Sequence, residues 1–147
     1  MNANSFANKR RLAREYVLQS LYLAEVGGLA AEQIFSIIGA SEISKVPESF
    51  EFYKNLFSLA LANLEQIDGV IKSVSQNWDI KRMAAVDKAI LRLAVCEMTV
   101  LKDTPAAVII DEAIEIAKKY STEKSGRFVN GIMDNIAKKG YRVEGVG

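Results

Sequence analysis

Histidine is absent from this chain of 147 residues. The sequence therefore lacks the most common general base and the most common transition-metal ligand. An enzyme built on it would have to rely on carboxylates, lysine or tyrosine. The single cysteine, Cys96, can form no intramolecular disulfide bond and lies in a mostly apolar run. We interpret its thiol as core packing rather than as a nucleophile, and we expect a reducing compartment, the cytoplasm.

Other features of active or membrane proteins are also absent. No apolar run approaches the roughly 18 to 20 residues of a membrane span, and no apolar segment follows the first charges, so we expect neither a span nor a targeting signal. The pair Gly27-Gly28 lacks the spaced glycine and lysine of a phosphate loop. The acidic residues Asp111, Glu112 and Glu115 are interpreted as the solvated surface of a helix rather than a metal site. We predict no catalytic residue, no cofactor and no metal.

The charge is small in total but uneven along the chain. The net charge is +1, whereas residues 1–14 carry +4, residues 15–117 carry −7 and residues 118–142 carry +5. If the two basic ends meet in space, they form a basic patch of the kind that binds phosphates. The alternative is that surface charges cluster by chance.

The apolar residues recur with helical spacing from end to end, and no run alternates with period two for long enough to indicate a sheet. The predicted fold is all-α, a compact single domain of six to seven helices. The first helix should be buried on several sides with only its basic end exposed. The halves, residues 1–77 and 78–141, are expected to pack as one unit. Helical segments are predicted over residues 6–26, 30–39, 47–74, 83–101, 105–120 and 125–140.

The apolar stripe from Phe50 to Val74 is the strongest period in the sequence, with steps of three and four residues. Regular opposite charges beside such a stripe would select a partner strand, and they are missing here. We therefore interpret the stripe as one face of an intramolecular bundle rather than as an intermolecular coiled coil.

Two helix starts carry unusual positive charge. The stretch NKRRLARE places Lys9, Arg10, Arg11 and Arg14 where the helix dipole favours acidic residues. The stretch STEKSGRFVNG supplies Lys124 and Arg127 at another predicted start, with Ser125 as its expected N-cap. Free backbone amides at helix starts bind anions readily, and a polyanion would relieve the repulsion between the cations.

Two aromatic residues indicate which class of polyanion the basic helix starts would bind. Tyr22 lies about two helical turns after Arg14, and Phe128 follows Arg127 directly. Single-stranded nucleic acids are held by backbone charges together with bases stacked on aromatic rings. Each aromatic residue alone is more typical of a core. Together with the basic ends, they favour RNA.

Three segments resemble the NusB family of transcription antitermination factors over nearly the whole chain. They are RRLAREYVLQSLY, VDKAILRLAVCEM and IIDEAIEIAKKYSTEKSGRFVNGIMDNI. The resemblance implies two small helical bundles without catalytic activity. It also implies binding of single-stranded boxA RNA from ribosomal RNA leaders, together with the ribosomal protein NusE, in a complex with RNA polymerase.

The resemblance also assigns roles to individual residues. Lys124 departs from relatives that carry an acidic residue there, and a cation should strengthen phosphate contact or reduce selectivity. Cys96 replaces an aromatic residue common in the family. Asp87 is the candidate for contact with NusE, on acidic C-terminal helices. With the two lysines added from the charge pattern, the predicted RNA-binding residues are Lys9, Arg10, Arg11, Arg14, Tyr22, Lys124, Ser125, Arg127 and Phe128.

Two alternatives stay open. The first is a relative of the NusB-like domain that some ribosomal RNA cytosine methyltransferases carry before their catalytic domain. The second is a helical protein-interaction adaptor or homodimer that uses its basic ends for docking and binds no RNA.

Overall fold

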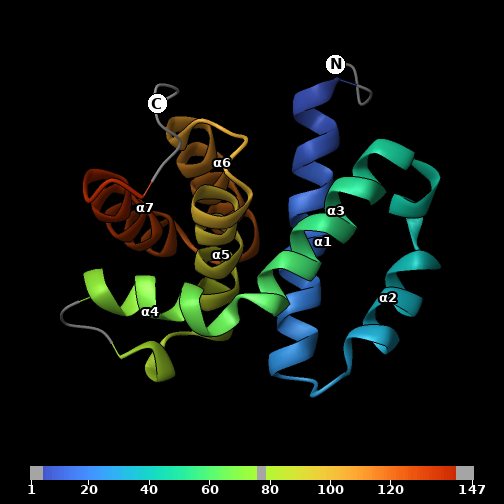
Figure 1. Ribbon diagram of the computed structural model, residues 1–147, viewed down its shortest axis with the longest axis horizontal. Coiled ribbons are helices and arrows are strands. Elements are labelled where there is room, and N and C mark those ends of the chain that lie inside the picture. The colour runs from blue at the N-terminus through green and yellow to red at the C-terminus, as the bar shows by residue number, and fades with distance from the viewer. Residues whose placement is uncertain (1–4, 76–78, 142–147) are drawn as a thin grey trace. The chain divides into compact units, whose positions relative to one another are not determined.

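The computed structural model describes residues 5–75 and 79–141 (Figure 1), and these residues contain helices and no strand. The predicted all-α class is therefore confirmed. The α-helices are α1 (Phe6–Glu25), α2 (Ala31–Gly39), α3 (Pro47–Ala62), α4 (Leu64–Val74), α5 (Ala85–Cys96), α6 (Ala106–Tyr120) and α7 (Glu123–Lys138). Shorter helical segments are η1 (Glu42–Lys45), η2 (Ile80–Arg82) and η3 (Glu97–Leu101).

The chain divides into two compact units, residues 1–58 and 59–147, and the boundary falls within α3. The split expected near residue 77 falls on residues 76–78, which lie outside the described residues. That the whole chain packs as one domain stays a prediction.

The first unit is organised around α1, which buries one broad face. Val17, Leu18 and Leu21 are at most 3% exposed. Gln19 and Tyr22 on the other side are exposed, so the prediction that only the basic end is exposed is wrong.

The hydroxyl groups of Ser20 and Tyr53 lie 2.7 Å apart and form a buried hydrogen bond between α1 and α3. Burial raises the pKa of the Tyr53 phenol to about 12, although this hydrogen bond acts in the opposite direction. A buried polar group needs such a partner, so the bond fixes the register of α3 against α1.

The long apolar stripe does not form one helix, because the chain breaks at Asn63 between α3 and α4. Asn63 has φ −119° and ψ 22°, and its side-chain Nδ2 donates to the carbonyl of Leu59 at 2.9 Å. Asparagine side chains bond to nearby backbone groups and so compete with helix propagation. The residues of the stripe are buried on both sides of the break, since Phe57, Ile67 and Ile71 are all fully buried.

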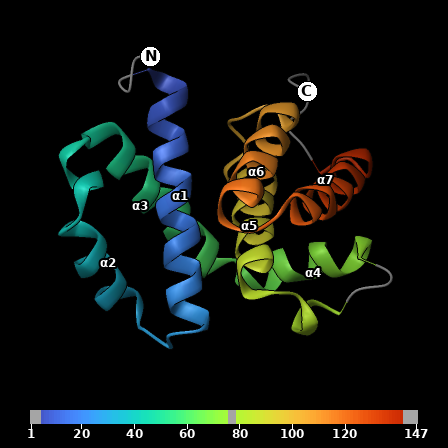
Figure 2. The same ribbon diagram turned by 180° about the vertical axis from the view of Figure 1, so that it is seen from behind.

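The second unit contains the end of α3 and the helices α4 to α7, in which α5 and α6 pack against each other and both contact α7 (Figure 1 and Figure 2). Its central helix is α5, where Ile90, Leu91 and Leu93 are at most 1% exposed. Arg92 binds Asp68 of α4 through two hydrogen bonds, Nε to Oδ1 at 2.9 Å and NH2 to Oδ2 at 2.8 Å. This two-point ion pair fixes the orientation of α4 on α5.

The end of α5 differs from the expected single helix over residues 83–101. The α-helix ends at Cys96 and continues as one wider π-type turn, η3, after which Lys102 adopts a left-handed conformation with φ 59°. Cys96 is fully buried, and burial raises the pKa of its thiol to about 12, with a smaller contribution from the charge of Glu97. The interpretation of Cys96 as core packing is confirmed.

The apolar run at the start of α6 is buried at only some of its positions. Val108 is 44% exposed. Ile109 and Ile116 are buried, at 2% exposure each. The run Val108-Ile109-Ile110 is apolar at three consecutive positions, so its pattern alone does not show which residue faces inward.

Candidate nucleic-acid interface

The start of α1 is capped in the usual way despite its positive charge. The side chain of Ser5 accepts a hydrogen bond from the backbone amide of Asn8 at 3.2 Å. No acidic residue occurs in the first turn. Instead, an acidic residue of α3 compensates the nearest cation, since Lys9 Nζ lies 2.9 Å from Glu48 Oε1. Ser49 Oγ also donates to the carbonyl of Lys9 at 2.8 Å, which ties α3 to this turn.

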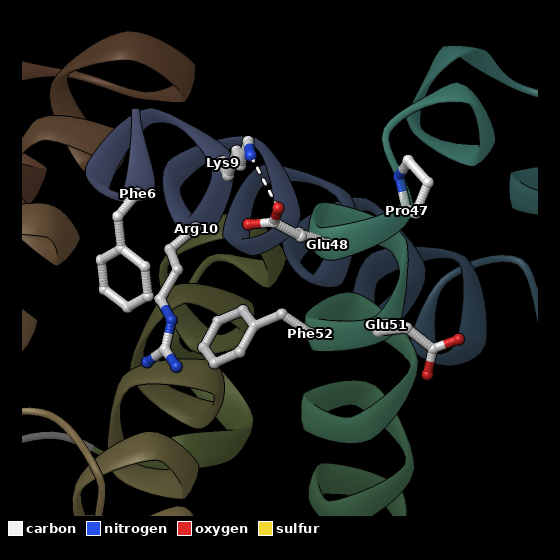
Figure 3. A pocket seen from close by; sticks show the side chains of 7 residues that line it. All are labelled: Phe6, Lys9, Arg10, Pro47, Glu48, Glu51 and Phe52. Carbon is white, nitrogen blue, oxygen red and sulfur yellow. Dashed lines mark ion pairs between the residues drawn. The ribbon is translucent and has the colours of Figure 1, made fainter. Parts of the chain in front are cut away.

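Arg10 lies between two aromatic rings. The guanidinium carbon is 4.6 Å from the ring centroid of Phe6 and 4.1 Å from that of Phe52 (Figure 3). A guanidinium group stacked in this way is held by cation–π attraction of about 0.5–1 kcal/mol per ring at exposed sites. Arg10 is therefore held in position before any ligand arrives.

The prediction that this end of α1 is exposed is wrong for Arg14. Arg14 is only 3% exposed, and its guanidinium carbon lies 5.6 Å from the ring centroid of Phe52. Cation–π attraction to the Phe52 ring offsets part of the cost of burying this guanidinium group. Arg11 is exposed, and Tyr22 is 39% exposed further along α1.

The start of α7 is capped by Thr122 and not by Ser125 as predicted. Thr122 Oγ1 accepts from the backbone amide of Ser125 at 3.0 Å. The prediction was wrong because Thr122 and Ser125 are both good capping residues, and the capping residue lies three positions earlier than the apolar pattern indicates. Lys124 and Arg127 are exposed, and Phe128 is half-buried.

Ser125 belongs to a hydrogen-bonded group that connects α7 to α5. Its hydroxyl lies 2.8 Å from the hydroxyl of Ser121 and donates to Asp87 Oδ2 at 3.3 Å. The next residue, Gly126, lies where α7 passes close to α6, since a Cβ atom there would be 3.4 Å from Lys118 Cγ. Both residues therefore position the basic start of α7 rather than standing free on the surface.

Asp87 lies in a hollow together with residues predicted to bind RNA. The hollow has a volume of about 230 Å³ and is lined by Arg82, Met83, Ala84, Asp87, Lys124, Ser125 and Phe128. Asp87 Oδ1 is buried and has no hydrogen-bond partner among the described residues. A buried carboxylate oxygen without a donor is costly, so a ligand that supplies one would be stabilised there.

The predicted residues thus form two groups. Lys9, Arg10 and Arg14 gather with Phe52 in the first unit. Asp87, Lys124, Ser125 and Phe128 surround one hollow in the second unit, and Arg127 is exposed on the same helix start. That the two groups form one shared surface stays a prediction, as does every assigned RNA contact.

Sequence reasoning missed four residues of these groups, Phe6, Glu48, Phe52 and Arg82. Phe6 had a detectable signal, because it precedes Arg10 by four residues and side chains four apart on a helix are neighbours. Glu48 and Phe52 are about 40 positions from Lys9 and Arg10, and Arg82 lies close to Asp87 in sequence but about 40 positions from Lys124.

The described residues contain neither a metal-binding cluster nor a membrane-spanning helix. No group of three or more histidine, cysteine, aspartate or glutamate side chains is arranged to hold a metal ion. None of the helices in residues 5–75 and 79–141 is long and apolar enough to cross a membrane.

Sequence comparisons with known proteins all indicate the same family. The sequence model of the NusB family matches residues 11–138. The transcription antitermination protein NusB of Elusimicrobium minutum is 43% identical over 131 residues, which cover 88% of this chain and 94% of that protein. The NusB of Salinibacter ruber is 40% identical over 129 residues, which cover 88% and 81% of the two chains.

Solved structures agree with the sequence comparison. The structure of T. maritima NusB superposes with a TM-score of 0.77 at 39% identity and covers 88% of this chain and 91% of that one. A chain from the crystal structure of the antitermination factors NusB and NusE in complex with double-stranded RNA gives a TM-score of 0.78 at 27% identity, and 89% and 97% of the two chains are covered.

Proposed function

The chain belongs to the NusB family, and from this premise we propose that it is a non-enzymatic transcription antitermination factor of the cytoplasm. It binds single-stranded boxA-like RNA of ribosomal RNA leaders together with NusE. In this role it joins the antitermination complex of RNA polymerase and supports transcription of ribosomal RNA operons.

The observation that carries the proposal is the preorganised positive charge at two helix starts. Arg10 is held between two rings, and Thr122 and Ser125 order the turn that presents Lys124 and Arg127. Ordered cations lose little conformational freedom when a phosphate binds, and rotamer-rich side chains otherwise cost about 0.5–1.5 kcal/mol each on immobilisation. In this proposal the cations hold phosphates, while Tyr22 and Phe128 contact bases.

Asp87 is proposed as a contact for NusE. Its Oδ1 atom has no donor among the described residues, and a basic protein can supply one. The NusB chain that resembles this one was solved together with NusE and RNA, which supports both kinds of partner for this chain.

The test is fluorescence anisotropy with a labelled boxA-like single strand, a scrambled strand of equal length and a duplex, each with and without NusE. We expect the boxA-like strand to bind most tightly and NusE to strengthen its binding further. Equal affinity for the scrambled strand would contradict sequence-specific recognition, and preference for the duplex would contradict the single-stranded substrate.

Light scattering coupled to gel filtration, with and without the boxA-like strand, tests the homodimer alternative. The proposal expects the strand to co-elute with the protein. A stable dimer that is indifferent to RNA would favour the protein-interaction adaptor.

Substitution of Glu48 by glutamine is expected to strengthen RNA binding about threefold. Glu48 pairs with Lys9 at 2.9 Å, so its carboxylate competes with a phosphate for the same cation and repels the strand. Affinity at low salt measures the effect. The matched control is Glu42→Gln, which removes the same charge from an exposed residue of the first unit that pairs with Lys45. An equal gain in both variants would mean that only the overall charge matters.

A further inference from the structure

Phe6 has the largest exposed fraction among the large hydrophobic residues that the structure describes as exposed, at 69%. A single exposed hydrophobic residue is common and needs no functional explanation. Phe6 differs because its ring is not isolated. It forms the outer layer of a stack in which Arg10 lies between Phe6 and Phe52 (Figure 3).

The stack borders a hollow of about 410 Å³ in the first unit, lined by Phe6, Lys9, Arg10, Pro47, Glu48, Glu51 and Phe52. This volume falls in the range of about 300–1,000 Å³ that is typical of small-ligand sites. Figure 3 shows the side chain of Glu51 directed away from the aromatic pair, while the Phe6 and Phe52 rings face the Arg10 guanidinium. The part of the hollow next to Phe6 is therefore formed by the Phe6 and Phe52 rings and the Arg10 side chain.

The charges that line the hollow are close to balanced. Lys9 pairs with Glu48 at 2.9 Å, and Glu51 pairs with Lys54 at 2.8 Å. A phosphate would therefore meet carboxylates as well as cations in the hollow itself. A flat uncharged group that stacks on a ring meets no such repulsion, and its phosphates can lie at the neighbouring cations Arg10 and Arg11.

We propose that the exposed face of Phe6, at the edge of this hollow, is a nucleobase subsite, in which one base of the bound RNA stacks on Phe6 and adds a layer to the Phe6–Arg10–Phe52 stack. The inference rests on the proposed function and adds Phe6 to the residues proposed to contact RNA. An RNA base is favoured over a protein side chain because Arg10 joins the subsite to the neighbouring cations of α1. Stacking on an aromatic ring accepts any base, so the subsite adds affinity without selecting a sequence.

The experiment uses the full chain and a set of boxA-like strands in which one nucleotide at a time is replaced by an abasic residue. For the parent protein, one abasic position should weaken binding about 5- to 150-fold through loss of the base that stacks on Phe6. Phe6→Ala should lose the same factor with the intact strand and should be indifferent to the abasic residue at that position. Phe6→Trp should restore binding, whereas Phe6→Leu, which keeps apolar bulk without a ring, should not.

The salt dependence separates stacking from an indirect effect on Arg10. Because Phe6→Ala removes no charge, the slope of log affinity against log salt should equal that of the parent. A flatter slope would show that Arg10 has left its phosphate and would overturn the stacking role. The matched control is Tyr141→Ala, which removes a ring that is 38% exposed in the second unit and should leave binding unchanged.

The remaining outcomes are also decisive. If the parent binds boxA-like RNA and Phe6→Ala binds it equally well, the subsite is wrong while the proposed function stands. If the parent binds no RNA, both fail. If Phe6→Ala changes only the dimerisation of the chain or only its affinity for NusE, the hollow receives a protein and the nucleobase subsite is overturned.

Discussion

Replacement of Arg11, Lys124 and Arg127 together by glutamine is expected to weaken binding of boxA-like RNA about a hundredfold at low salt. All three side chains are exposed, so the change tests phosphate contact without removing packed residues. A contribution of about 1 kcal/mol per contact, below the usual value for hydrogen bonds to charged groups because the sites are exposed, gives this factor. Arg10 and Arg14 are less suitable, because they pack on Phe52.

Salt dependence provides an independent measurement of the same variant. The slope of log affinity against log salt changes by about 0.7 for each phosphate contact to a single strand, so the triple variant should flatten the slope by about 2. The control replaces Lys45, Lys72 and Lys102, which are also exposed, and changes the net charge equally. Equal losses in both variants would show that only net charge matters.

The substitutions of the triple variant, made separately for each helix start, test whether both helix starts bind one RNA strand. If they do, Arg11→Gln and the double change of Lys124 and Arg127 should each lower affinity at unchanged stoichiometry. If they belong to separate sites, removal of either group should instead reduce the number of strands bound. That result would contradict the shared surface.

Asp87→Asn is expected to weaken NusE binding without weakening RNA binding. Removal of its charge should weaken NusE binding tenfold or more, because hydrogen bonds to charged groups contribute about 1.5–3 kcal/mol. It should leave binding of RNA alone unchanged or slightly tighter, because Lys124 lines the same hollow and loses a competing anion. Anisotropy with RNA alone and calorimetry with NusE separate the two effects.

The control for this prediction is Asp111→Asn, at an exposed position of α6. It should change neither affinity. Asparagine is chosen at position 87 because its side-chain oxygen can still accept from Ser125, so the start of α7 should stay ordered. Equal weakening of RNA and NusE binding would mean that Asp87 acts only by holding that turn in place.

The helices were predictable because each one buries a periodic apolar face, and α1, α2 and α6 begin and end within about one residue of the expected positions. Errors arose where local chemistry competes with period. Asn63 interrupts the helix although the apolar spacing of the stripe is unbroken in the sequence, and Thr122 caps α7 in place of Ser125. The periodicity of apolar residues indicates which face of a helix is buried. It does not indicate which polar side chain forms hydrogen bonds with the backbone at the ends of the helix.

The candidate site was predictable only in part. The distribution of charged residues along the sequence showed where the cations concentrate. It did not show that Arg14 is buried or that Glu48 lies against Lys9. Pairs between α1 and α3 join residues about 40 positions apart, such as Ser49 and Lys9, and no local pattern encodes them. Asp87 was assigned to a separate surface, whereas it lies beside Ser125.

The hydrogen bond from Ser125 to Asp87 has a consequence for cooperativity. It connects the helix start proposed to hold RNA with the carboxylate proposed to meet NusE, so a ligand that reorients one group changes the free energy of the other. Thermodynamic reciprocity then requires that NusE tightens RNA by the same factor by which RNA tightens NusE. Two weak encounters would in that way become one stable ternary assembly, and it would dissociate as soon as either component is lost.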